Sequence, residues 1–193
     1  MGKGNDEEGV LSPQSRTTLL DIARKTLAGY VKTGKAPRLD QDDPELQGLN
    51  GAFVSLHKGG QLRGCIGNFR SSDPLYRTIS EMTISAAARD PRFAPVNEDE
   101  LDEIDVEISV LSPLRRIEDI EEIEVGKHGI YITKGLHRGV LLPQVAERYG
   151  WDRITFLEQT CLKAGLSPDD WKKAKIQIFS AEIFGDEDLG DEE

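Results

Sequence analysis

The chain has 193 residues, of which 37% are hydrophobic and 31% charged, and its net charge is −11. This composition is typical of one folded domain, or of two small lobes, with a strongly hydrated surface. It excludes a membrane-spanning helix, because no apolar run approaches the roughly 20 residues that such a helix requires. Residues 1–9 contain no apolar core of a secretory signal, so we expect a cytoplasmic protein.

The charge is distributed unevenly along the chain. Asp186–Glu193 contains six acids, and without them the net charge is near −5. We expect residues 1–11 and the acidic tail 185–193 to be disordered on either side of a domain at 12–184. Lys58–Arg92 is the locally basic stretch, with six bases and three acids. It favours a small anionic ligand or an acidic partner segment and argues against nucleic acid, which usually meets a broad basic face.

The first half of the chain predicts a helix, a hairpin, a second helix and a strand. Ser12 and Pro13 are typical of a helix start, and Gly34 and Pro37 of its end. Residues 52–57 and 62 onward predict two strands around a glycine turn. Asp73 and Pro74 predict the start of a helix with the buried stripe Leu75, Ile79, Met82 and Ala86. The alternating residues 105–111 predict a half-buried strand.

The second half repeats this order. Residues 129–133 and 138–142 predict a hairpin, followed by helical turns at 143–149. A further helix follows with the apolar face Ile154, Leu157, Cys161 and Ala164, and residues 175–184 predict a final strand. Arg63 and Gly64 in the first half match Arg138 and Gly139 in the second. We therefore predict an α+β fold with pseudo-repeats at about 51–112 and 128–184, each a strand-strand-helix-strand unit, around a mostly antiparallel sheet.

The segment LRGCIG at residues 62–67 combines a cation, a thiol and two glycines on a predicted strand. Glycines allow sharp bends or close approach of a ligand, and a strand arginine requires an acceptor for its guanidinium. If Leu62 and Ile66 point inward, a period of two places Arg63 and Cys65 together on the other face, unless a bulge intervenes.

This segment resembles the signature of the AMMECR-domain family, and more closely that of its bacterial and archaeal branch, AmmeMemoRadiSam system protein A. Residues 52–56, 86–87 with 90–93, 107–111, 128–129 and 141–145 are also similar to that family, in order. The resemblance implies a duplicated α+β fold around a barrel-like sheet and a catalytic or binding role for the motif without an established reaction. The name of the branch implies two partners, a Memo-type protein and a radical-SAM protein.

Cys65 is the candidate catalytic residue, as a nucleophile activated by Arg63 or a histidine. The structural alternative is a small buried residue of the strand. Arg63 is suited to capture a carboxylate or phosphate, or to form a structural ion pair with an acid such as Glu107 or Asp90. Candidate ligand-binding residues are Arg63, Gly64, Gly67, Arg92, Glu107 and His128.

The other candidates each have a structural alternative. Arg89, Asp90 and Arg92 also fit a helix stop with local salt bridges. Glu107 also fits a residue on the solvated face of its strand, and His128 also fits a hydrogen-bonded histidine in a turn. Cys161 is predicted to lie in the core. The sequence contains no zinc-ligand spacing and no phosphate-loop or dinucleotide fingerprint, so we expect neither a metal nor a cofactor.

Two functions of different classes remain open. The first is a binding module with a cleft at LRGCIG for an anionic small ligand or a partner segment. The second is a cysteine-dependent enzyme in which Cys65 is the nucleophile and Arg63 stabilises an oxyanion or a carboxylate. Nucleic-acid binding is a third and weaker alternative, because the chain is acidic.

Overall fold

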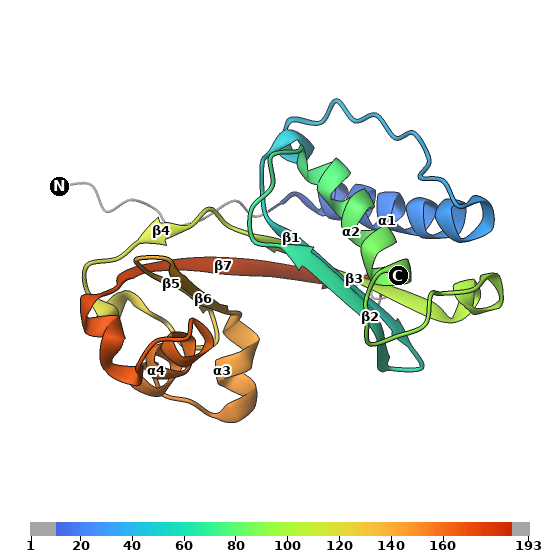
Figure 1. Cartoon of the computed structure of the whole chain (residues 1–193). Coiled ribbons are helices and arrows are strands. Elements are labelled where there is room, and N and C mark those ends of the chain that lie inside the picture. Colours follow the sequence, from blue (N-terminus) through green and yellow to red (C-terminus); the bar gives the residue numbers. More distant parts are fainter. Residues whose placement is uncertain (1–10, 187–193) are drawn as a thin grey trace. The chain divides into compact units, whose positions relative to one another are not determined.

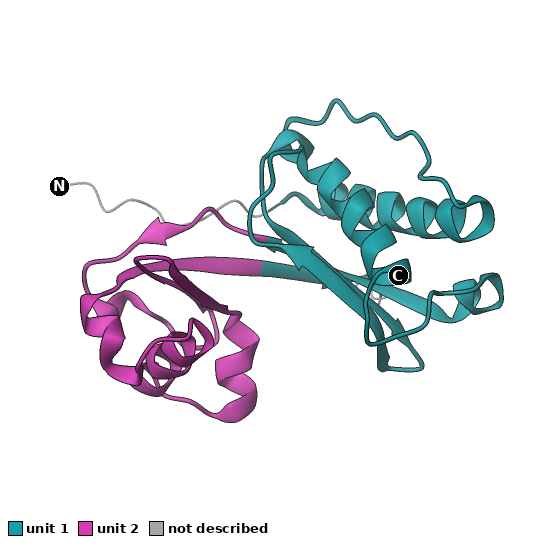
Figure 2. Cartoon of the chain, viewed as in Figure 1, with its two compact units in different colours: residues 1–110, 182–193 teal, residues 111–181 magenta. Residues whose placement is uncertain are grey.

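A computed structural model describes residues 11–186, and the chain divides into two compact units (Figures 1 and 2). Unit 1 contains the residues up to Val110 and those from Glu182 onward, and unit 2 is Leu111–Ala181. The strand β7 (Lys175–Gly185) contributes residues to both units. Within the described residues, no helix is both long and apolar enough to cross a membrane.

Unit 1 consists of a sheet with helices on one face (Figure 1). Its elements are α1 (Pro13–Thr33), η1 (Pro44–Gln47), β1 (Ala52–Lys58), β2 (Gln61–Asn68), α2 (Leu75–Ala88), η2 (Glu98–Glu103) and β3 (Ile104–Leu111). β1 pairs antiparallel with β2 on one side and β3 on the other, so β2 is the edge strand. Helix α2 packs on β1 and β2, and α1 packs on α2.

The core of unit 1 lies between this sheet and its helices. Burial alternates along β1, where Val54 and Leu56 are fully buried and Phe53, Ser55 and His57 are half-buried. The same alternation begins β3, with Val106 and Ile108 inside. Because successive strand side chains point to opposite faces, the helix-covered face is apolar and the other face carries the polar side chains.

The predicted ends of the first helix are confirmed. The Ser12 side chain accepts a hydrogen bond from the Ser15 N–H, and Gly34 ends the helix in the left-handed conformation with φ of 69°. The predicted stripe of α2 is also buried. Its start is one residue later than expected, because Pro74 takes the N-cap position and the Asp73 N–H bonds to Ser71 Oγ in the preceding turn.

Unit 2 has its own sheet and core. Its elements are β4 (Arg115–Arg116), η3 (Ile120–Glu122), β5 (His128–Lys134), β6 (His137–Leu141), α3 (Pro143–Tyr149), α4 (Arg153–Lys163), η4 (Pro168–Lys173) and most of β7. β5 pairs antiparallel with β6 and β7, and β4 pairs with β7. Phe156, Leu157 and Cys161 of α4 are fully buried. Ile154, expected on the same face, is exposed, because it lies in the first turn of the helix.

The predicted α+β class and antiparallel pairing are confirmed, and both units follow the order of two strands, helix and strand. The glycine of each Arg-Gly strand has the same structural reason. A Cβ on Gly64 would lie 2.2 Å from the Ala86 carbonyl oxygen of α2, and one on Gly139 would lie 2.5 Å from the Thr160 carbonyl oxygen of α4. Only glycine allows each strand to pack so closely on its helix.

The expected disorder at the two ends of the chain falls mainly on residues 1–10 and 187–193, outside the described residues. The described part of the predicted tail is ordered by contacts in unit 1. Gly185 ends β7, and the Asp186 carboxylate contacts Arg24 and accepts a hydrogen bond from the Val106 N–H.

Candidate functional site

Cys65 lies in a row of three polar residues that crosses the sheet of unit 1 on the face opposite the helices. It pairs with Ser55 on β1, and Ser55 pairs with Glu107 on β3. The Ser55 hydroxyl donates to Cys65 Sγ at 3.2 Å, and the thiol is free and half-buried. The row therefore places a hydroxyl beside the thiol and a carboxylate on the next strand.

The backbone of Cys65 is held from outside the sheet by two residues that follow α2. Its N–H donates to Asp90 Oδ2 at 2.9 Å, and its carbonyl accepts from Arg92 Nη2 at 3.4 Å. Arg92 also donates to both carboxylate oxygens of Asp90, from Nε at 2.9 Å and Nη2 at 2.7 Å. Asp90 and Arg92 thus cover the open backbone groups of an edge strand, which would otherwise be available to another chain.

Asp90 is a buried carboxylate with four hydrogen bonds. The donors are the Arg92 side chain through two nitrogens and the N–H groups of Cys65 and Arg92. Its side chain is only 2% exposed, whereas that of Arg92 is 55% exposed. The bonds from Arg92 and Cys65 hold the pKa of Asp90 well below its usual value, against the opposing effect of burial. Asp90 therefore stays ionised and fixes Arg92 from one side.

Arg63 does not share the environment of Cys65, because β2 has a bulge at this point. Leu56 pairs with Gly64 and His57 with Leu62, so Arg63 is an extra residue between two pairs. The bulge that the sequence left open is present, so the period of two does not hold here: Leu62 is exposed, and the side chains of Arg63 and Cys65 contact different partners.

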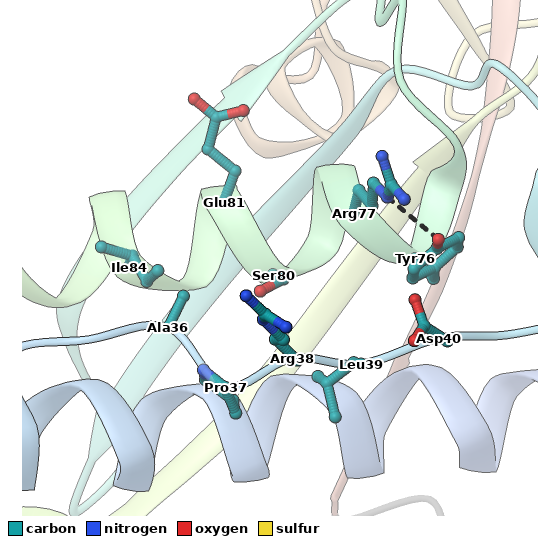
Figure 3. Close-up of a pocket in the computed structure, with 10 residues that line it drawn as sticks. All are labelled: Ala36, Pro37, Arg38, Leu39, Asp40, Tyr76, Arg77, Ser80, Glu81 and Ile84. Atoms are coloured by element: carbon teal, nitrogen blue, oxygen red, sulfur yellow. Dashed lines mark hydrogen bonds between the residues drawn. The ribbon is translucent and has the colours of Figure 1, made fainter.

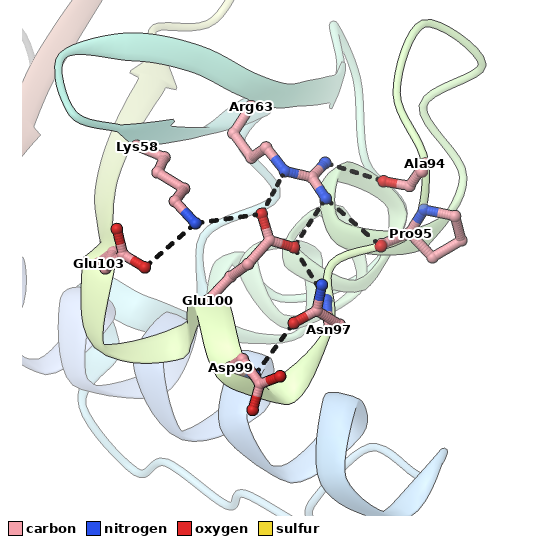
Figure 4. A network of polar contacts seen from close by, with 8 residues as sticks. All are labelled: Lys58, Arg63, Ala94, Pro95, Asn97, Asp99, Glu100 and Glu103. Carbon is pink, nitrogen blue, oxygen red and sulfur yellow. Dashed lines mark hydrogen bonds and ion pairs between the residues drawn. The ribbon is translucent and has the colours of Figure 1, made fainter.

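The Arg63 guanidinium binds Glu100 of η2 with two parallel hydrogen bonds (Figure 4). Nε donates to Oε1 at 3.0 Å and Nη2 to Oε2 at 2.9 Å, while the carbonyls of Ala94 and Pro95 accept two further bonds. Lys58 contacts the same carboxylate at 3.6 Å. These contacts lower the pKa of Glu100 to about 2. Arg63 thus forms a structural ion pair, with Glu100 in place of the acids that the sequence suggested.

The two glycines of LRGCIG are explained by close packing. Gly64 lies against α2, as described above. A Cβ on Gly67 would lie 2.2 Å from the Phe53 ring on β1. Neither residue has a left-handed backbone. Both glycines therefore adapt β2 to its neighbours, and their role in binding a ligand stays a prediction.

Glu107 lines a cavity of about 400 Å³ in unit 1 together with His57, Asp105 and Asp186. Among the described residues its carboxylate forms no hydrogen bond or ion pair. The described chain contains no group of three His, Cys, Asp or Glu side chains arranged to hold a metal ion. The local surplus of carboxylates makes this cavity unsuited to an anion.

His128 and Cys161 belong to unit 2, whereas LRGCIG belongs to unit 1. His128 begins β5, is buried, and its Nδ1 accepts a hydrogen bond from the Glu124 N–H at 3.1 Å. It is thus a well-bonded histidine at the entrance to a strand. Cys161 lies in the core as expected, and burial raises the pKa of its thiol.

Sequence reasoning did not foresee the roles of Ser55 and Glu100, nor that Asp90 holds the backbone of Cys65. Ser55 lies on β1 opposite Cys65, and the predicted hairpin with its register would have identified it. The partner of Arg63 carried no such signal, because Glu100 is 37 residues away and belongs to a 3-10 helix.

The sequence pattern that defines the AMMECR1 family matches residues 20–184. A protein of Methanosarcina mazei is 43% identical over 173 residues, covering 84% of this chain and 87% of its own length. A protein of Methanothermobacter thermautotrophicus is 44% identical over 184 residues, covering 90% of this chain and 95% of its own. The crystal structure of the uncharacterized protein PH0010 from Pyrococcus horikoshii is similar, with a TM-score of 0.77, 41% identity and coverage of 88% of this chain and 90% of that one. The expected family is thus confirmed, and the chain belongs to the AMMECR1 family.

Proposed function

We propose that this chain is a binding module whose site is the edge of β2 at Cys65, where Arg92 binds a carboxylate of a small ligand or of a partner segment. The observation that carries the proposal is the bonding of the three nitrogens of the Arg92 guanidinium. Its Nε and Nη2 are fixed by Asp90 and by the carbonyl of Cys65, while Nη1 has no hydrogen-bond partner among the described residues. A guanidinium held in this way loses little conformational entropy when a carboxylate binds to its remaining nitrogen.

The surroundings of Arg92 favour a carboxylate as the bound group and do not favour an added β-strand. The outward N–H and C=O of Cys65 already bond to Asp90 and Arg92, so an added strand would find no backbone partner there. The Arg92 guanidinium lies 5.4 Å from the centre of the Phe93 ring, which adds an apolar surface beside the charge. Arg89 is exposed and forms no ion pair in the described chain, so the segment carries a net positive charge.

A comparison with Arg63 also supports Arg92 as the arginine that binds the carboxylate. The Arg63 side chain is 16% exposed, and four donor contacts engage it within the protein. Arg92 is 55% exposed, and its Nη1 has no hydrogen-bond partner in the described part of the chain. Of the two predicted ligand-binding arginines, Arg92 has the open donor, and Arg63 stabilises the loop that follows α2.

The test is a titration of the ¹⁵N-labelled full chain with N-acetyl-triaspartate, monitored by two-dimensional NMR. We expect the amide signals of Cys65 and Arg92 to move and Arg92→Gln to weaken binding by about tenfold or more, as for loss of a charge-assisted hydrogen bond. Arg138→Gln is the control, because Arg138 is the exposed arginine of the second Arg-Gly strand. An unchanged affinity in Arg92→Gln, or an equal loss in Arg138→Gln, contradicts the proposal.

A cytoplasmic location and a Memo-type or radical-SAM partner, which the family resemblance implies, fit this function. Either partner would present an acidic segment to Arg92. Co-purification of such a partner with the wild-type chain and its loss with Arg92→Gln would support this extension. Equal recovery with both chains would contradict it.

A second candidate function is cysteine-dependent catalysis, and the Ser55 hydroxyl that donates to Cys65 Sγ at 3.2 Å favours it. Among the described residues no histidine forms a hydrogen bond with this sulfur, so no imidazole is placed there as a base. A nucleophilic Cys65 would react with iodoacetamide much faster than free cysteine near neutral pH, and Ser55→Ala would slow that reaction. A rate similar to or below that of free cysteine contradicts the catalytic function and leaves the binding proposal intact.

A further inference from the structure

Unit 1 contains a second cavity, of about 590 Å³, between α2 and the segment 36–40 that follows α1 (Figure 3). Its volume is typical of sites for small molecules, which span roughly 300–1,000 Å³. None of the residues that line it belongs to LRGCIG or to the segment 89–93. It is therefore independent of the function proposed above.

One wall of this cavity is apolar and fixed. Pro37, Leu39 and Ile84 contribute to it. Pro37 packs on α1, where a Cβ on Gly29 would lie 3.4 Å from its ring, and Leu39 packs on the core of the unit. Tyr76, only 5% exposed, adds its ring. Such a wall can bury the hydrocarbon part of a ligand without rearrangement.

Two arginines that line the cavity have no carboxylate partner within residues 11–186. In the same unit, four other arginines each contact one: Arg16, Arg24, Arg63 and Arg92. In the described chain, by contrast, Arg38 and Arg77 form no ion pair. Figure 3 shows the Arg38 side chain directed toward Ser80 on α2. Arg38 can therefore give both edges of its guanidinium to an anion, and Arg77 can give the nitrogens other than Nε, which bonds to Tyr76.

Tyr76 adds a directed donor beside these charges. Its hydroxyl accepts a hydrogen bond from Arg77 Nε at 2.9 Å, and the guanidinium lies 5.5 Å from the centre of its ring. Because the phenol oxygen acts as the acceptor in that bond, its own proton is available to an acceptor in the cavity. Arg77 and Tyr76 thus present N–H and O–H groups from adjacent positions of α2.

The acids of the cavity limit the charge of the ligand. Asp40 and Glu81 also line it, so its formal charge is balanced. Figure 3 shows Glu81 directed away from the segment 36–40. A single negative charge is therefore better matched than the double charge of a phosphate monoester. We propose that this cavity binds a small monocarboxylate with an apolar body, held by Arg38, Arg77 and the Tyr76 hydroxyl and packed on Pro37, Leu39 and Ile84.

The test is calorimetric titration of the full chain with benzoate and octanoate, with benzamide and inorganic phosphate for comparison. We expect both carboxylates to bind more tightly than benzamide and phosphate. Arg38→Gln and Arg77→Gln should each weaken benzoate binding by about tenfold or more. Arg148→Gln, at an exposed position of α3 in unit 2, should leave it unchanged.

A third variant tests the cavity and not only its charges. Ile84→Trp adds volume to the apolar wall and should abolish the binding of both carboxylates while the circular dichroism spectrum stays that of the wild type. Equal binding of benzamide and benzoate, unchanged affinity in both arginine variants, or full benzoate binding by Ile84→Trp each overturns the proposal. Because Arg92 is untouched in these variants, the result does not depend on the N-acetyl-triaspartate titration.

Discussion

The backbone N–H of Cys65 on β2 donates to the buried carboxylate of Asp90, 25 residues further along the chain, at 2.9 Å. Asp90 in turn holds Arg92, whose Nη2 reaches back to the Cys65 carbonyl. The thiol position, the end of α2 and the exposed guanidinium are thus parts of one hydrogen-bonded arrangement. A change at Asp90 should therefore affect the fold and the proposed site together.

Asp90→Asn should lower the free energy of unfolding by about 2–3 kcal/mol. The amide keeps the size of the carboxylate but loses the charge that receives the bonds from Arg92, and one of its two ends no longer accepts a hydrogen bond. Urea unfolding at pH 7 measures the change. Asp73→Asn, at an exposed position before α2, is the control and should alter stability by less than about 0.5 kcal/mol. If Asp90→Asn also lowered the free energy of unfolding by less than about 0.5 kcal/mol, the Asp90–Arg92 pair would contribute nothing to the stability of the fold.

Stability should fall at acidic pH because Asp90 and Glu100 have lowered pKa values in the folded chain, that of Glu100 about 2. In the unfolded chain they titrate near their ordinary values of about 3.9 and 4.3. The unfolded state therefore binds more protons as the pH falls below about 5, and the stabilisation present at neutral pH is lost progressively toward pH 2.

Glu100→Gln isolates one part of this pH dependence. Its stability should differ most from that of the wild type above pH 5, and the difference should shrink between pH 5 and pH 2. The measurement is a series of urea unfolding curves at fixed ionic strength. Glu98→Gln, at an exposed position of η2, is the control. A difference between Glu100→Gln and the wild type that is independent of pH would contradict the role of the Arg63–Glu100 pair.

Much of the fold could be predicted from the sequence, because its signals are local. Alternation identified β3, two strand-forming runs around a glycine turn identified β1 and β2, helix caps identified the ends of α1, and the order of elements suggested two similar halves. The sequence left a bulge in β2 open but gave no local signal for its position at Arg63, or for the ion pair of Arg63 with Glu100, which lies 37 residues away. The predicted burial of Ile154 is wrong because helical spacing does not show how much of the first turn of a helix the core covers.

The candidate site was predicted less well than the fold. The sequence identified Cys65 and Arg92, and the geometry connects them through Asp90. It could not distinguish the paired Arg63 from the half-exposed Arg92, because burial and partners depend on the tertiary structure. The glycines were interpreted as places where the backbone bends sharply or a ligand approaches closely, and the structure adds that Gly64 allows α2 to approach β2.

This close packing gives a prediction for the two related glycines. Gly64→Ala and Gly139→Ala should each destabilise the chain by about 1–3 kcal/mol, because each added Cβ would meet the backbone of a helix, at 2.2 Å and 2.5 Å respectively. Gly29→Ala is the matched control, since its Cβ would make an ordinary contact at 3.4 Å and it lies inside α1. It should stabilise the chain by about 0.5–1 kcal/mol. Thermal and urea unfolding of the three variants test this, and a Gly64→Ala chain as stable as Gly29→Ala would show that β2 can move away from α2 without cost.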